Sequence, residues 1–179
     1  MNFSADLYRR ALHFAATAHG AQKVPGSEHS YVVHLTSVAA EVLALAMSGV
    51  EEFDVELAMT CALLHDTLED TKTAEEAVGA AFGQAVLDGV RALTKNEALP
   101  KAQRMADSLA RIVAQPREIA LVKLADRITN LEPPPHYWTQ AKCAAYREEA
   151  RQISAALGHA SPALKRRLEE KIESYAAYT

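Results

Sequence analysis

The sequence predicts an all-α protein that forms a single compact multi-helix domain. Its 179 residues suit one ordinary domain with a single core. Apolar residues recur at helical spacing along most of the chain, and no segment shows the apolar–polar alternation that is typical of a strand. Glycine and proline gather in short groups between the helical segments. Because we find no repeat or linker, the domain is expected to span residues 1–179.

The first half of the chain predicts three helices and one long loop. Leu7 to Ala18 place apolar side chains on one helical face, and residues 20–30, rich in Gly, Pro and Ser, form the loop that follows. A second apolar face runs from Val38 to Ala46 and stops near Gly49. A third helix begins near Val55 and leads directly into Leu64-His65-Asp66.

The second half predicts a further series of helices separated by turn residues. Thr73 and Glu76 have the spacing of a capping box and predict the start of a short helix. Pro100 is expected at the first position of the helix that includes residues 105–113. Pro133–Pro135 must end the helix that includes residues 119–131. The apolar faces in this half cover residues 86–93, 105–113, 119–131 and 138–157, with a last helix opened by Ser161-Pro162 and continuing to Tyr175.

Composition restricts the classes of partner. A formal net charge of −4 argues against a nucleic-acid partner, and no apolar run has the length of a membrane span. The segment Met1–Arg10 lacks the pattern of a secretion signal. Cys61 and Cys143 lie in apolar helical segments, which favours buried free thiols. We therefore expect a cytoplasmic protein with no membrane and no nucleic-acid partner.

The strongest local signal for chemistry follows the third apolar helix. His65, Asp66, Glu69 and Asp70 place four ionisable side chains within six positions. Neighbouring side chains on a helix point roughly 100° apart, so His65 and Asp66 can meet one ion only where the helix ends. An imidazole nitrogen beside a carboxylate suits a borderline divalent cation such as Mn, Fe or Zn.

Two further candidate ligands, again a histidine and an aspartate, occur on other predicted helices. His34 opens the second helix, and Asp126 shares a helical face with the apolar Ile119 and Val122, where a carboxylate needs a compensating charge. Taken singly, each has an ordinary interpretation: a helix-ending pair at His65-Asp66, a structural ion pair at Asp126 and a helix-start residue at His34. Their joint arrangement on three helices favours one divalent metal site.

The order His34, His65-Asp66, Asp126 resembles the H…HD…D signature of the histidine–aspartate (HD) superfamily. The segments His65–Thr71 (HDTLEDT) and Val122–Leu131 (VKLADRITNL) resemble, more closely, the small alarmone hydrolases. These are stand-alone relatives of the hydrolase domain in bifunctional ppGpp synthetase–hydrolases. The resemblance runs from Ala11 to Tyr175 and implies an HD-type domain.

The resemblance also implies a reaction and roles for individual residues. The reaction would be hydrolysis of the 3′-pyrophosphate of guanosine tetraphosphate (ppGpp) to GDP and pyrophosphate. Glu69 and Asp70 would orient and deprotonate the attacking water, and one ion, Mn(II) by preference, would be bound by the four ligands. These ligands are His34, His65, Asp66 and Asp126. The resemblance also assigns Lys23, Asn130 and Tyr146 to substrate binding. Apart from the resemblance, Lys95, Lys101 and Arg104 are candidates for balancing the charge of the substrate, and solvated surface is the ordinary interpretation of the basic residues.

Two alternative functions remain open at this stage. One is another HD phosphohydrolase acting on a nucleotide such as NADPH, which would use the same metal and acids with a different pocket. In the family's basic loop Lys23 is followed by Val24-Pro25-Gly26 and not by a second basic residue, a departure that bears on this choice. The other is a metal-binding regulatory module without turnover. The charged helix from Lys165 to Glu173 is a candidate face for a homodimer or merely solvated surface.

Overall fold

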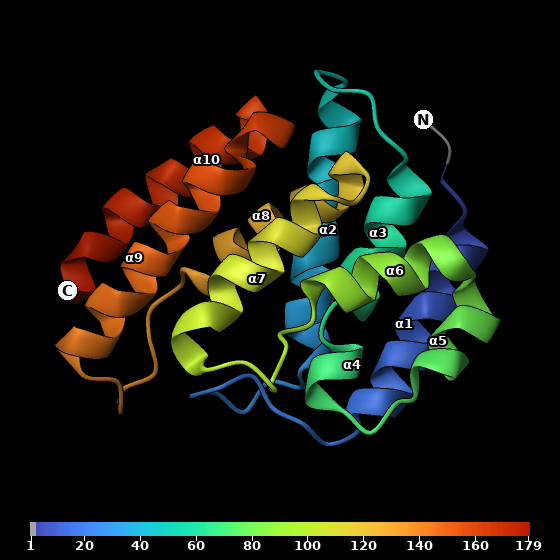
Figure 1. Cartoon of the computed structure of the whole chain (residues 1–179), viewed down its shortest axis with the longest axis horizontal. Coiled ribbons are helices and arrows are strands. Elements are labelled where there is room, and N and C mark those ends of the chain that lie inside the picture. The colour runs from blue at the N-terminus through green and yellow to red at the C-terminus, as the bar shows by residue number, and fades with distance from the viewer. Residues whose placement is uncertain (1–2) are drawn as a thin grey trace.

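The computed structural model describes residues 3–179, and these residues form an all-helical domain, as the sequence predicts (Figure 1). The only β-type pairing within this range is an isolated bridge between Lys23 and Ser30. The α-helices are α1 (Ala5–His19), α2 (Val32–Ser48), α3 (Val55–Leu64), α4 (Thr67–Asp70), α5 (Glu75–Phe82), α6 (Gln84–Leu93), α7 (Lys101–Val113), α8 (Arg117–Asn130), α9 (Gln140–Leu157) and α10 (Pro162–Ser174). Two 3₁₀ turns complete the set, η1 (Gly158–Ala160) and η2 (Tyr175–Tyr178).

Helices α3 and α8 form the centre of the core. Almost every residue of α3 is buried, because its sequence is apolar on all sides and it packs against α1, α2, α6 and α8. Helix α8 is buried from Glu118 to Ile128 and contacts α2, α3, α6, α7, α9 and α10. In Figure 1, α2 and α8 lie in the middle, with α9 and α10 on one side and α1, α5 and α6 on the other. The candidate ligands at the end of α3 and on α8 are therefore held by the most buried part of the fold.

Helix starts follow the predicted chemistry in one case and depart from it in two. Ser161 caps α10 by accepting a hydrogen bond from the backbone N–H of Leu164, as its sequence predicts. The predicted capping box at Thr73 is wrong: α5 begins after Ala74, and the Thr73 hydroxyl instead bonds the Thr71 hydroxyl at 2.7 Å. Pro100 also precedes α7 as its N-cap and is not its first helical residue.

Two expectations about the whole chain can be compared with the described residues. Cys61 and Cys143 are both buried free thiols, as the sequence predicts. Among residues 3–179 we find no helix with the length and apolarity that a membrane crossing requires. Helix α4 was not expected from the sequence, which indicated only the end of a helix over residues 67–72.

Candidate functional site

Three of the predicted metal ligands meet where α3 ends. Helix α3 stops at Leu64, so the backbone turns at His65 and Asp66 and the two adjacent side chains reach the same point. Asp66 Oδ2 lies 3.0 Å from His65 Nε2, and the Nε2 atoms of His65 and His34 are 3.2 Å apart. His34 comes from the first turn of α2 and lies 3.6 Å from Asp66 Oδ2. The ligand-type atoms of all three residues lie within 4.8 Å of one another.

Asp126 reaches this cluster from α8. Its Oδ1 atom is 3.5 Å from His34 Nε2 and 3.6 Å from His65 Nε2. Its second oxygen, Oδ2, accepts a hydrogen bond from the buried ammonium of Lys123 at 2.9 Å. The Asn130 amide also donates to Oδ1, so Asn130 touches a candidate ligand as well as lying near the expected substrate site. The structure thus brings together two imidazoles and two carboxylates from α2, α8 and the end of α3.

The protonation of His65 tests whether this group of residues fits a cation. His65 Nδ1 lies 2.8 Å from the carbonyl oxygen of Ala62, which can only accept a hydrogen bond. Nδ1 therefore carries a proton, and Nε2 is the ring atom that faces the carboxylate of Asp66 and the imidazole of His34. Lone pairs and carboxylate oxygens converging at this distance require a positive charge between them. The donor set, two nitrogens and two oxygens, fits a divalent ion.

Without a metal ion, protons supply that charge, and the pKa values record it. Burial by itself would lower the pKa of the His34 and His65 imidazoles, but the carboxylates of Asp66 and Asp126 outweigh it and raise both. Burial would likewise raise the pKa of the Asp66 and Asp126 carboxyls. The positive neighbours, His65 for Asp66 and Lys123 for Asp126 foremost, hold both well below their usual range. The cluster is an electrostatic unit that attracts positive charge.

Tyr31 is a member of the site that the sequence analysis missed. This buried residue immediately precedes α2, and its hydroxyl donates to Asp66 Oδ2 at 2.5 Å. Burial, and next the charge of Asp66, raise the pKa of the Tyr31 hydroxyl, so it stays protonated and acts as a donor. Tyr31 therefore fixes the orientation of a candidate ligand.

Glu69 and Asp70 lie on the single turn of α4 and have different partners. Lys95 binds Glu69 twice, through its ammonium to Oε1 at 2.7 Å and its backbone N–H to Oε2 at 3.0 Å. Asp70 Oδ2 accepts the side-chain amide of Gln22 at 2.9 Å. The sequence analysis did not single out Gln22, which is 48 positions away from Asp70.

A pocket of about 350 Å³ adjoins the ligand cluster. His34 lines it, together with two residues predicted to bind substrate, Asn130 and Tyr146. The remaining wall is mainly apolar and includes Val24, Pro25, Val33, Pro133, Pro134, Pro135 and Trp138. The proline run that ends α8 thus forms one wall, and loop 20–30 forms the facing part.

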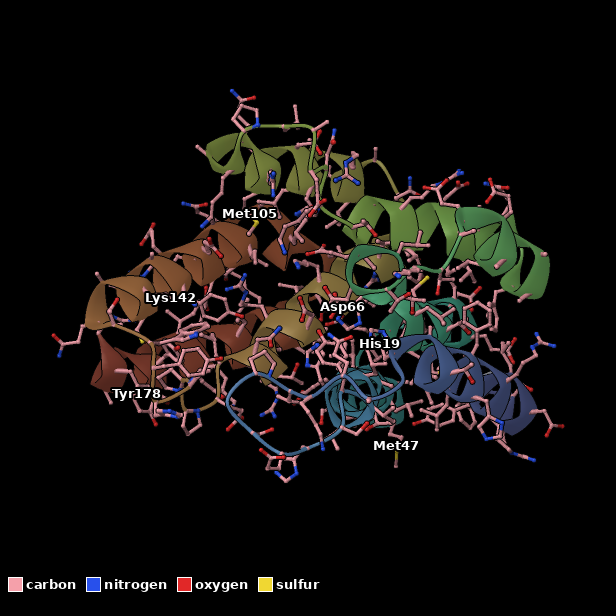
Figure 2. All side chains as sticks on the ribbon, turned by 90° about the horizontal axis from the view of Figure 1, so that it is seen from below. His19, Met47, Asp66, Met105, Lys142 and Tyr178 are labelled. Atoms are coloured by element: carbon pink, nitrogen blue, oxygen red, sulfur yellow. The ribbon has the colours of Figure 1, made fainter. Side chains whose placement is uncertain are left out.

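Aromatic and cationic contacts stiffen the wall around Tyr146. The Tyr146 ring meets Trp138 edge to face at 5.1 Å, and the buried guanidinium of Arg127 lies over it at 4.1 Å from its centre. The Lys142 ammonium lies 4.1 Å from the centre of the Trp138 ring. Lys142, which is labelled in Figure 2, is an exposed cation beside the pocket that the sequence analysis missed.

The four basic residues predicted to bind substrate do not line this pocket. Lys23 donates to the carbonyl of Glu28, and Lys95 binds Glu69. Arg104, on α7, donates to the carbonyl oxygens of Glu97 and Leu99 in the preceding loop, and Lys101 is exposed at the start of α7. Their roles in substrate binding stay predictions. In this structure Lys23 and Arg104 bind carbonyl oxygens of loops, and Lys95 pairs with the carboxylate of Glu69.

Comparisons with known proteins agree with this geometry. A family described as "HD domain" matches residues 11–163. Over 172 residues the chain is 33% identical to guanosine-3′,5′-bis(diphosphate) 3′-pyrophosphohydrolase MESH1 of Danio rerio, with 93% of each protein covered. It is 32% identical to the enzyme of the same function name from Aquifex aeolicus, covering 87% of this chain but 21% of that protein.

Similarity extends to a solved structure. The fold matches a protein described as a metazoan ortholog of SpoT that hydrolyses ppGpp, with a TM-score of 0.84 and 27% sequence identity. The match covers 97% of this chain and 98% of that one.

Proposed function

The chain belongs to the HD domain family, and we propose that it is a metal-dependent phosphohydrolase that removes the 3′-pyrophosphate of ppGpp. The products would be GDP and pyrophosphate. Relatives that carry this activity in their names align with nearly the whole chain, which supports the reaction and a single domain over residues 1–179.

The metal site of this proposal consists of His34, His65, Asp66 and Asp126. We propose Mn(II) as the ion, because a mixed set of imidazoles and carboxylates suits borderline to hard divalent cations. Such an ion, when bound, polarises phosphoryl oxygens and makes water more acidic. Lys123 binds the outer oxygen of Asp126, and Tyr31 donates to Oδ2 of Asp66, the oxygen that faces the imidazoles, so both carboxylates are oriented before any ion binds.

The position of His34 carries the proposal. This residue belongs to the ligand cluster and also lines the pocket of about 350 Å³. A molecule in the pocket therefore lies directly against the candidate metal site. The apolar and aromatic wall, with Trp138 and Tyr146, suits the flat face of a nucleoside, and the ligand cluster suits its phosphates.

The chain's own acids would activate the nucleophile. Glu69 and Asp70 follow the proposed ligand Asp66 within one turn, on α4, which begins directly after that residue. A carboxylate that accepts a proton from water at this point contributes general base catalysis. Lys95 lies against Glu69 and is available to meet the charge of a substrate phosphate.

The cellular location and the partner proposed for this enzyme follow from its cysteines and its net charge. Two buried free thiols fit a reducing cytoplasm, and a net charge of −4 does not favour nucleic acid. The partner of this proposal is therefore a small nucleotide. A homodimer through the charged helix α10 stays a prediction.

Product analysis tests the function. The purified protein is incubated with Mn(II) and ppGpp, and with NADPH in a parallel reaction, and the products are separated by chromatography. GDP and pyrophosphate in equal amounts are the expected result. Release of phosphate from NADPH with ppGpp unchanged would replace the substrate while keeping the metal site. No turnover of either by the metal-loaded protein would contradict the enzymatic proposal.

A further inference from the structure

The two acids that follow the ligand cluster are bound in different ways, and this difference divides their roles. Both oxygens of Glu69 are occupied by Lys95, one by the ammonium at 2.7 Å and one by the backbone N–H at 3.0 Å. Asp70 is exposed, and Gln22 binds only its Oδ2 atom. Glu69 therefore has no oxygen free of Lys95, whereas Oδ1 of Asp70 has no hydrogen-bond partner among the described residues and can accept a hydrogen bond from a water.

The orientation of Gln22 follows from the chemistry of its two neighbours. The Asp70 carboxylate can only accept, so the atom 2.9 Å from it is the Gln22 amide nitrogen. The amide oxygen, Oε1, then faces His19 Nδ1 at 2.8 Å. An oxygen in that position needs a donor, and His19 must therefore carry a proton on Nδ1.

His19 is held rigidly in this position. It is the last residue of α1, is 5% exposed, and stacks on Tyr31 with ring centres 4.8 Å apart and planes 22° from parallel. Its other nitrogen, Nε2, is buried with no hydrogen-bond partner among the described residues. A proton on Nε2 would be left without an acceptor, which again favours Nδ1–H. In the view of Figure 2, His19 and Asp66 lie near one another towards the middle of the molecule, which agrees with their shared contact with Tyr31.

A continuous set of contacts therefore joins the acid to the ligand cluster. It runs from Asp70 through Gln22 and His19 to the ring of Tyr31, whose hydroxyl binds Asp66 Oδ2. Each contact fixes a side chain that would otherwise rotate. The position of the Asp70 carboxylate is in this way tied to a candidate metal ligand by residues of another part of the chain.

We propose that Asp70, and not Glu69, accepts the proton of the attacking water, and that Gln22, oriented by His19, is the positioning residue that holds Asp70 in place. The inference rests on the proposed phosphohydrolase function. The water oxygen forms a bond to the phosphorus, the bond from phosphorus to the 3′ oxygen breaks, and the proton taken by Asp70 is returned to that leaving oxygen. Glu69 serves instead to hold Lys95.

The first experiment compares Gln22→Met with a matched control, Gln84→Met. Gln84 donates the same kind of amide bond to Asp88 at 2.7 Å, but on the exposed surface of α6. Gln22→Met is expected to lower kcat about 10- to 100-fold, with KM and the bound Mn(II) unchanged, as for the loss of a supporting contact. Gln84→Met is expected to match the wild type. A normal kcat in Gln22→Met would overturn the proposal.

A second pair of variants tests the donor atom of His19. Asparagine places an amide nitrogen near the position of Nδ1, whereas leucine has the same shape and no donor. His19→Asn is therefore expected to keep most of the turnover that His19→Leu loses. Equal loss in both variants, with folding intact by circular dichroism, would reduce His19 to a structural role and contradict its part in the proposal.

A third pair of variants tests which of the two acids accepts the proton. Asp70→Asn is expected to lower kcat by at least about 100-fold, the range of general base catalysis, and Glu69→Gln by clearly less. The reverse order would overturn the proposal.

A measurement without turnover separates this inference from the proposed function. Long-range ¹H–¹⁵N correlation spectra of the metal-free protein report which nitrogen of His19 is protonated. Nδ1–H is expected, together with a Gln22 amide resonance that shifts in Asp70→Asn. Nε2–H with an unshifted Gln22 amide would overturn the positioning contact, even if ppGpp is hydrolysed. If the spectra agree and ppGpp survives, the substrate is wrong and the contact stands.

Discussion

Lys123 and Asp126 lie one helical turn apart on α8, and the lysine ammonium donates to Asp126 Oδ2 at 2.9 Å. Both residues are buried, at 9% and 6% exposure. The pairing leaves Oδ1 directed towards His34 and His65. Lys123 therefore balances the carboxylate charge without taking the oxygen that a metal ion would need, and this arrangement makes it more than a surface lysine.

Replacing Lys123 by Met should destabilise the metal-free protein. Removing one partner of a buried ion pair leaves an uncompensated charge, which costs about 3 kcal/mol in the free energy of unfolding. Excess Mn(II) should reduce that loss, because a bound ion supplies positive charge to the same carboxylate. Urea unfolding with EDTA and with Mn(II) measures both values. Lys72→Met, at an exposed lysine, is the control, and an equal small effect in the two variants would show that the Lys123 pair is unimportant.

The stability of the metal-free protein should depend on pH in a defined window. The pKa values of the Asp66 and Asp126 carboxyls are lowered from 3.8, so their contribution is present above that pH and is lost as the pH falls through their folded-state values. The pKa values of His34 and His65 are raised from 6.5, so their contribution is complete below pH 6.5 and is lost as the pH rises through the folded-state values. The lowered carboxyl pKa values and the raised imidazole pKa values arise largely from the same carboxylate–imidazole pairs.

Unfolding with EDTA is therefore expected to show a free energy that declines as the pH rises above 6.5. Metal binding should show the opposite trend, because protons must leave the imidazoles before an ion can bind. Denaturant titrations at a series of pH values, with and without Mn(II), measure the two trends. Metal-free stability that increases above pH 6.5 would contradict the charge pairing described for the cluster.

The fold class and the ligand cluster could be predicted because both leave local signals. Apolar positions at helical spacing identify a helix without knowledge of its neighbours, and the HD doublet at a helix end places two ligand types together. Asp126 was recognisable since a carboxylate on an apolar helical face needs a partner. Burial of Asp126 within α8 agrees with that argument.

The supporting residues left no such signal. Gln22 and Tyr31 meet their partners over 48 and 35 positions of sequence, and a single polar residue in a loop shows no periodicity. The capping box failed for a related reason, since Thr71 competes for the Thr73 hydroxyl and its neighbour Ala74 becomes the N-cap. Local patterns thus identify candidate ligands, whereas the contacts that orient them depend on how the loops pack.

Loss of one imidazole should remove both metal and activity. His65→Ala deletes a nitrogen that lies within 3.2 Å of His34 and 3.0 Å of Asp66. The variant is expected to bind no stoichiometric Mn(II) and to lose turnover together with it. Metal content after gel filtration and the rate of hydrolysis measure the two effects. His13→Ala, at an exposed histidine of α1, should keep both. Turnover without bound metal in His65→Ala would refute the ligand assignment.

The close packing of Gly26 on Pro135 predicts an effect on substrate binding. Gly26 has a φ of +78°, and a Cβ atom there would lie 2.7 Å from Pro135 Cβ. Gly26→Ala should therefore push loop 20–30 away from the proline run, and Pro25 and Pro135 both line the pocket beside His34. Gly20→Ala is the control in the same loop: its φ of +53° also strains an alanine, but a Cβ there meets nothing within 4 Å. Steady-state kinetics should show a KM that rises several-fold in Gly26→Ala alone, while kcat and bound metal stay near the wild-type values, because the ligand cluster lies on other segments. Equal KM values in the two alanine variants would mean that the loop and the proline run do not shape the binding site.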